Sequence, residues 1–130
     1  MSIHNSIFNK LPHKIVKTAI EEVNLFPLGI FEGRAFTLVT LEQGKYYPPH
    51  VHNKSQSKVH IIFGNGTFIL DGKEQQYKKG DVFLIKSRVS HGFRVKEQTL
   101  FLSIETPPII NPKTNEVDIE YVDSKAIGGL

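Results

Sequence analysis

Apolar and polar residues along this chain form short segments separated by turn residues, a pattern typical of β-structure. Many of these segments are rich in β-branched and aromatic residues, which favour strands over helices. The segments predicted as strands are residues 34–42, 46–52, 59–63, 67–70, 82–85, 92–95 and 100–105. No long segment with helical periodicity lies between them, so the pattern predicts an antiparallel all-β sandwich or barrel.

Glycine marks the places where the chain is expected to turn. Asp71-Gly72 is typical of a two-residue hairpin turn, whose backbone conformation glycine adopts readily. Residues 64–66 (Gly-Asn-Gly) predict a second tight turn, and Gly80 predicts a third. The Pro48-Pro49 pair cannot donate backbone hydrogen bonds, which places this part of its strand at a rim or a bend.

Three regions follow from this pattern. Residues 1–33 are expected to form an N-terminal arm and a leading segment that packs on the barrel, residues 34–108 the barrel core, and residues 109–130 a C-terminal tail. Apolar residues between positions 14 and 23 have a helical spacing, but the same stretch is acceptable as a strand. The sequence therefore leaves open whether the N-terminal region holds a short helix or a strand.

The C-terminal tail contains an alternating apolar pattern at Val117, Ile119 and Tyr121, as in a strand. A strand of this kind needs a partner, because apolar side chains and an unpaired strand edge left in water promote association. We therefore expect the tail to pack on the barrel or to cross to a second subunit.

Composition narrows the function classes. A chain of 130 residues is expected to be one domain, and the lack of cysteine removes disulfides, thiolate metal sites and cysteine nucleophiles. The net charge of +3 is dispersed along the chain, which disfavours nucleic-acid binding. No leader-like segment and no long apolar stretch occurs, so no membrane partner and a cytoplasmic location are predicted.

Three histidines form the main candidate for chemistry. His50 and His52 lie two residues apart in a predicted strand, so their side chains point to the same face. If the chain returns through the predicted turns, His91 reaches a neighbouring strand and completes a set of three imidazoles. Three convergent histidines suit a divalent ion such as iron, manganese, nickel or zinc. The alternative is a pocket whose histidines hold no metal.

Four further residues are predicted to lie around the same pocket. Tyr46 has the strand parity of the first two histidines and is the candidate catalytic acid or base. Phe93, two residues after His91, would form an apolar wall that contacts the substrate. Lys86 and Arg88 belong to the preceding loop and are candidates for binding a phosphate or carboxylate of the substrate.

The spacing of these residues resembles the two motifs of the cupin superfamily. The residues that carry the resemblance are Gly44, His50, His52 and Gly64 for the first motif, and Gly80 and His91 for the second. The resemblance covers residues 34–108 and implies a small RmlC-like jelly roll, an antiparallel double-stranded β-helix, with the three histidines as metal ligands. It also implies a homodimer, because cupin barrels commonly pair.

The chain departs from this pattern at the position of the usual glutamate ligand. Ser57 stands there, or Gln56 if the register slips by one residue, and neither side chain is a strong ligand. A carboxylate from elsewhere, such as Glu42, Glu74 or Glu105, could take its place. Without one, a divalent ion keeps its full formal charge, which favours an anionic or chelating substrate.

The resemblance implies an enzyme that acts on a small polar molecule, and the first interpretation is a sugar or sugar-phosphate isomerase or epimerase. A bound metal would polarise a carbonyl or enediolate oxygen while a nearby group moves a proton. Two alternatives stay open, because one fold supports many activities. They are a three-histidine iron dioxygenase and a non-catalytic small-molecule-binding barrel that has lost the glutamate ligand.

Overall fold

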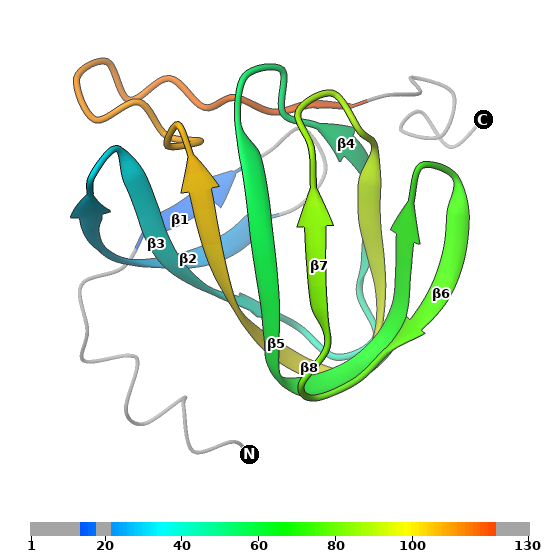
Figure 1. Cartoon of the computed structure of the whole chain (residues 1–130). Helices are drawn as coiled ribbons and strands as arrows, with labels where there is room; N and C mark the ends of the chain where they lie inside the picture. Colours follow the sequence, from blue (N-terminus) through cyan, green and yellow to red (C-terminus); the bar gives the residue numbers. More distant parts are fainter. Residues whose placement is uncertain (1–13, 18–21, 122–130) are drawn as a thin grey trace.

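The computed structural model describes residues 14–17 and 22–121, and this part of the chain forms strands and no helix (Figure 1). The strands are β1 (Lys14–Lys17), β2 (Glu22–Phe31), β3 (Arg34–Leu41), β4 (Tyr46–Val51), β5 (Gln56–Leu70), β6 (Lys73–Tyr77), β7 (Val82–Ile85), β8 (His91–Thr106) and β9 (Glu120–Tyr121). Their pairings are all antiparallel. The predicted all-β jelly-roll class is therefore confirmed.

The sheet closes into a barrel because its two longest strands bend. The strand order β1-β2-β3-β8-β4-β9 forms one path, and β5 joins β8 to β6 and β7. In Figure 1, β5 and β8 each descend on one side of the barrel, turn at its lower end and rise on the other side. Both ends of each strand therefore lie near the upper end of the barrel as drawn.

The bend in β5 corrects one expectation from the sequence. Residues 64–66 do not form a turn but lie inside β5, where its register with β8 shifts. A Cβ atom at Gly64 would lie 2.4 Å from the backbone oxygen of Gln98. Glycine is needed here because two bent strands approach closely, and that need produces the same local sequence as a turn. The partner strand β8 also bends without a turn, so the two predicted segments 92–95 and 100–105 belong to one strand.

The other predicted turns are present. Asp71 and Gly72 connect β5 to β6, with φ angles of 52° and 78°. Gly80, with a φ angle of 94°, precedes β7. Positive φ angles at both central residues are typical of the tight turn that matches the twist of two antiparallel strands.

The described ends of the chain are strands that extend the barrel. β1 pairs with β2, so Lys14–Lys17 adopts the strand alternative, while residues 18–21 lie outside the described residues. At the other end, β9 pairs with β4, and a single bridge joins Ile110 to Val117. The C-terminal segment therefore packs on the barrel of its own chain up to Tyr121.

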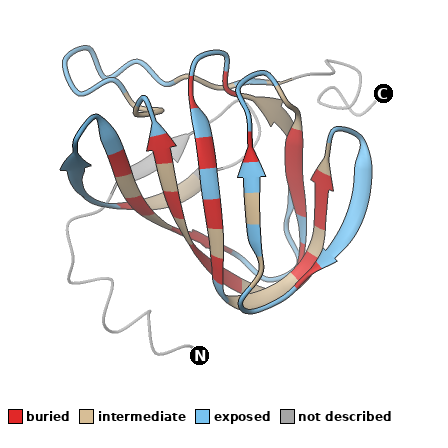
Figure 2. Cartoon of the chain, viewed as in Figure 1, coloured by how far each residue is buried: buried red, intermediate tan, exposed pale blue. Residues whose placement is uncertain are grey.

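Inward-facing side chains form one hydrophobic core. Buried positions alternate with partly buried ones along β3 and with mostly exposed ones along the first half of β5 (Figure 2). The buried cluster comprises Val39, Leu41, Tyr47, Val59, Ile61, Phe68, Tyr77, Ile85, Phe93, Val95 and Phe101. Phe93 is central, because its ring contacts Phe68, Tyr77 and Phe101 at centroid distances of 5.0, 5.5 and 5.5 Å. Since Phe93 follows His91 by two residues, the core adjoins the histidines along β8.

Within the described ranges the chain has no helix that is long and apolar enough to cross a membrane.

Candidate metal centre

The three predicted histidines come together because two strands pair beside each other. His50 on β4 is the register partner of His91, the first residue of β8. His52 follows β4 and points to the same side. A shift in register between Tyr47 and His50, at the two prolines, bends β4 at this point. The predicted meeting of the three imidazoles is observed.

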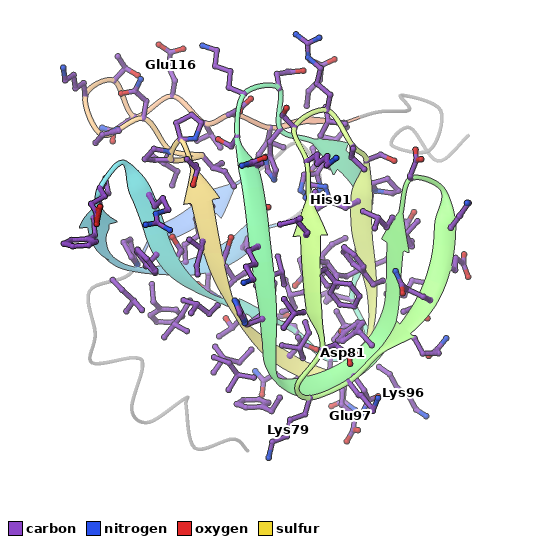
Figure 3. The ribbon with its side chains drawn as sticks, viewed as in Figure 1. Lys79, Asp81, His91, Lys96, Glu97 and Glu116 are labelled. Atoms are coloured by element: carbon purple, nitrogen blue, oxygen red, sulfur yellow. The ribbon has the colours of Figure 1, made fainter. Side chains whose placement is uncertain are left out.

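The imidazole rings form a compact group near the upper end of the barrel, where Figure 3 labels His91. Ring centroids lie 4.3 Å apart for His50 and His91, 4.9 Å for His52 and His91, and 5.1 Å for His50 and His52. One nitrogen of each ring lies within 4.8 Å of the other two. The group is compact enough for the three nitrogens to share one ion.

Hydrogen bonds fix which ring nitrogens are free. The Nδ1 atoms of His50, His52 and His91 lie 3.2, 2.6 and 3.0 Å from backbone carbonyl oxygens. A carbonyl oxygen only accepts, so each Nδ1 carries the proton and donates it. Each Nε2 then keeps its lone pair for a ligand, which is the arrangement of metal-binding histidines in proteins.

Burial keeps these imidazoles neutral. Removal from water and, to a lesser extent, the neighbouring His52 lower the pKa of His50 to about 4, against the raising effect of the hydrogen bond to Pro48. Burial also lowers the pKa of His52, and it holds that of His91 well below its ordinary value together with the other two rings. Neutral imidazole is the form that binds metal, so this donor set fits a divalent first-row ion.

Asp118 fastens the C-terminal segment to the loop after β4. Its carboxylate accepts hydrogen bonds from the backbone N–H groups of Asn53, Lys54 and Ser55 at 2.8, 2.8 and 3.0 Å. Partial burial alone would raise the pKa of this carboxyl, but these donors and His52 together lower it. The backbone carbonyl of Asp118 is also the acceptor for His52. One residue therefore holds the loop and orients a candidate ligand.

A cavity of about 460 Å³ extends from the histidines into the barrel. Strands β2 to β5, β7 and β8 line it, and the C-terminal segment contributes apolar side chains such as Ile109, Val117 and Ile119. Most of the lining is apolar, and no lysine or arginine is among the described residues that form it. The cavity therefore suits a small molecule with a largely apolar body.

The position of the usual glutamate ligand faces this cavity. Ser57 is buried and lines the cavity, whereas Gln56 is exposed, so the chain keeps the register without a slip. The register partner of Ser57 on β8 is Glu105, which is buried and also lines the cavity. Among the described residues, only the three histidines form a group that could hold a metal ion, so Glu105 is not part of that cluster.

Phe93 is buried in the wall of the cavity, as predicted, whereas Tyr46 does not line the cavity. Tyr46 is 40% exposed and packs under the guanidinium of Arg94 on the outside of the barrel. The predicted orientation was wrong because the irregularity at the two prolines changes the strand parity. Tyr47 therefore shares the inward face with the histidines and lines the cavity.

The two basic residues of the loop before β8 do not line the cavity. Lys86 and Arg88 are exposed and do not line it, although the backbone N–H of Arg88 donates to the carbonyl oxygen of His52 at 2.8 Å. Sequence reasoning missed Asp118 and Tyr121, which also lines the cavity. The alternating apolar pattern of the tail was the only feature that could have pointed to them.

The fold and the histidine centre define a class, that of small β-barrels with a three-histidine site at one end of an apolar cavity. Residues 37–105, more than half of the chain, match the family described as cupin domain. The chain belongs to the cupin family. No curated protein matches the chain.

Solved structures with the same fold are distant in sequence. KdgF from Halomonas sp. shares 16% identity with a TM-score of 0.65, over 77% of this chain and 89% of that one. A predicted oxalate decarboxylase from Thermotoga maritima shares 22% with a TM-score of 0.64, over 77% and 96%. An RmlC-like cupin from Shewanella frigidimarina shares 15% with a TM-score of 0.66, over 77% and 86%. At these identities the similarity shows the fold alone.

Proposed function

We propose that this cupin is a metal-dependent enzyme that shifts a proton on a small carbonyl compound, an isomerase-type activity. The observation that carries the proposal is the group of three neutral imidazoles whose Nε2 atoms are free at one end of an apolar cavity. A divalent ion bound there would act as a Lewis acid on a ligand oxygen.

The lining of the cavity supports a substrate with an apolar body. A phosphate or a sugar hydroxyl needs hydrogen-bonding or charged partners, and few polar side chains face the cavity: Thr37, Tyr47, Ser57, Ser103, Glu105, Tyr121 and the histidines. Because Lys86 and Arg88 lie outside, a sugar phosphate is the weaker candidate. A carbonyl oxygen directed at the histidines, with a hydrocarbon body among the apolar side chains, fits best.

The names of structural relatives point to several reactions. One relative is named ectoine synthase from P. lautus, with 17% identity and a TM-score of 0.60, and another is a predicted oxalate decarboxylase. Both names concern reactions of small molecules, in agreement with the size of the cavity. They do not select one reaction for this chain.

Elemental analysis of protein purified without chelators is the first test. We expect about one equivalent of iron, manganese, nickel or zinc per chain in the wild type and none in the His50→Ala/His91→Ala double variant. His60→Ala is the matched control, because His60 lies outside the cavity and should leave the metal content unchanged. A wild type that neither holds metal nor gains thermal stability from added metal would contradict the proposal.

A three-histidine iron dioxygenase is the second candidate. The observation that favours it is the lack of a carboxylate in the donor set. Iron as the bound metal, with oxygen consumed when a substrate is added, would select this reaction. Proton exchange without oxygen uptake would select the isomerase. A protein that binds small apolar ligands without any metal would instead be a non-catalytic binding barrel.

A further inference from the structure

Glu105 is the one carboxylate side chain among the described residues that line the cavity. It is the second-last residue of β8, and it is 7% exposed. Glutamate is rarely buried to this degree unless a cation pairs with it. Here no lysine or arginine lines the cavity, so a buried carboxyl without a counter-ion faces the space where a ligand would bind.

The partners of Glu105 are neutral. The Ser103 hydroxyl donates to its Oε2 at 2.8 Å, and the backbone N–H of Ile109 also donates to the carboxyl. Its register neighbours are Ala35 on β3 and Ser57 on β5. The titratable groups that line the same cavity are His50, His52, His91, Tyr47 and Tyr121.

The bend in β8 relates Glu105 to the histidines. His91 begins β8 and Glu105 nearly ends it, and both ends of this strand rise to the same end of the barrel (Figures 1 and 3). Both side chains line one cavity, in opposite arms of the same strand. Ser57 occupies the position of the usual glutamate ligand, so no long side chain from that position fills the cavity beside Glu105.

We propose that Glu105 is the acid–base group of this cavity, which takes a proton from a bound carbonyl compound and returns it. The inference rests on the proposed function, because it requires the ligand oxygen to lie at the three histidines. Glu105 would then face the hydrocarbon part of the same ligand. It assigns to this residue the role that the sequence had suggested for Tyr46.

The proton balance closes within the cavity. The carboxylate of Glu105 takes a proton from the carbon next to the carbonyl group, and the electron pair of that C–H bond stays with the ligand as an enolate. Glu105 is then a neutral acid. When it returns the proton to the same carbon, the ligand regains its carbonyl form, and no oxidant or further reactant is consumed.

Burial supports this role. It raises the pKa of Glu105 from 4.5 to about 7, against the lowering effect of the hydrogen bonds from Ser103 and Ile109. A group with a pKa near the working pH exchanges protons in both directions efficiently.

Infrared difference spectroscopy of the metal-free protein tests Glu105 without reference to activity. We expect a carbonyl band of a protonated carboxylic acid that disappears as the pH rises through neutrality, and that is absent in Glu105→Gln. Glu116→Gln is the control, because Glu116 is an exposed carboxylate outside the cavity. A wild-type protein without this band would overturn the proposal.

Hydrogen exchange in a simple ketone tests the chemistry. Cyclohexanone, which joins a carbonyl group to an apolar ring, is incubated in D₂O with metal-loaded protein, and NMR follows deuterium entry beside the carbonyl. We expect the wild type and Glu116→Gln to accelerate exchange equally. Glu105→Gln should be slower by about 100-fold or more, with partial recovery in Glu105→Asp. Equal rates in the wild type and Glu105→Gln would overturn the proposal.

Metal analysis of the same variants separates this inference from the proposed function. We expect Glu105→Gln to retain the metal content of the wild type. Loss of metal would make Glu105 a ligand, which would overturn its role as proton-transfer group but leave the metal centre standing. A wild type without metal would instead contradict the proposed function, whatever the infrared band shows.

Discussion

At the scale of single residues, the titration of Glu105 is coupled to folding. Its pKa is about 7 in the folded protein against an ordinary value of 4.5. Between these pH values the folded state holds a proton that the unfolded state releases, so its contribution to stability falls as the pH rises. The contribution is complete below pH 4.5 and is lost as the pH passes through about 7.

The variant Glu105→Gln should therefore change the pH dependence of stability. Glutamine does not titrate. The free energy of unfolding of the variant should therefore rise relative to that of the wild type as the pH rises, by up to about 3 kcal/mol. Urea unfolding of both proteins without metal measures this difference. The three histidines titrate in the opposite sense, but they are common to both proteins and cancel. A difference that does not vary with pH would contradict the prediction.

A second residue-scale feature is Asp118, whose carboxylate accepts three backbone hydrogen bonds while its carbonyl orients His52. Asp118→Ala should lower the free energy of unfolding by about 1–3 kcal/mol, because three backbone N–H groups lose a charged acceptor. It should also weaken metal binding about 10-fold or more, because the carbonyl loses its fixed position. Urea unfolding and metal titration measure the two effects.

Glu120→Gln is the matched control for Asp118. Glu120 belongs to the same segment and accepts a hydrogen bond from the exposed Asn53 side chain. Its replacement should change stability by no more than about 0.5 kcal/mol. If Asp118→Ala left metal affinity unchanged, the C-terminal segment would have no role in orienting His52.

At the scale of elements, the site depends on the close contact of β4 with the start of β8. A Cβ atom at Gly92 would lie 2.6 Å from the backbone oxygen of Tyr47 and 2.9 Å from the nitrogen of Pro49. Backbone atoms cannot move aside as a flexible side chain does. Glycine at this position therefore lets His50 and His91 pair.

Gly92→Ala should push β4 and β8 apart next to the histidines. We expect a loss of about 1–3 kcal/mol of stability from overpacking, together with weaker metal binding. Gly72→Asn is the control, because nothing lies within 4 Å of a Cβ there and asparagine tolerates its positive φ angle. Thermal unfolding and metal content are the measurements, and an unchanged metal content in Gly92→Ala would contradict this account.

At the scale of the whole molecule, exposed apolar side chains on the outside of the barrel indicate where a second chain could bind. Val82 and Leu84 on β7 are 49% and 64% exposed, and Ile62 on β5 is 40% exposed. Both β7 residues pair with outward-facing positions of β5. Exposed apolar side chains on paired strands are common in interfaces, and we propose that these belong to the expected homodimer.

Leu84→Lys should therefore dissociate the dimer. Light scattering coupled to size-exclusion chromatography should give the mass of two chains for the wild type and of one chain for the variant. Leu28→Lys is the control, since Leu28 is 56% exposed on β2 and should leave the dimer intact. A monomeric wild type would remove the proposal, and dissociation by Leu28→Lys alone would move the interface to β2.

Local sequence patterns were enough to predict most strands of the barrel and the three histidines, but they did not predict β2 or β6 as strands. Alternating side chains decide which face of a strand is buried, so the shared direction of His50 and His52 was predictable. The Asp71-Gly72 turn was predictable because its backbone conformation is favoured by these residue types. By contrast, residues 64–66 were misassigned, since close packing of two strands and a tight turn both require glycine.

The sequence by itself determined the all-β class, the cupin family and the histidine set, because short-range periodicity and motif spacing carry that information. Only the tertiary structure decided which side chains line the cavity together with the histidines. The strand irregularity before His50 turned Tyr46 outward and Tyr47 inward. The bend of β8 brought Glu105 into the cavity of a histidine 14 positions earlier. Such contacts depend on register and curvature along whole strands, which no local stretch of residues specifies.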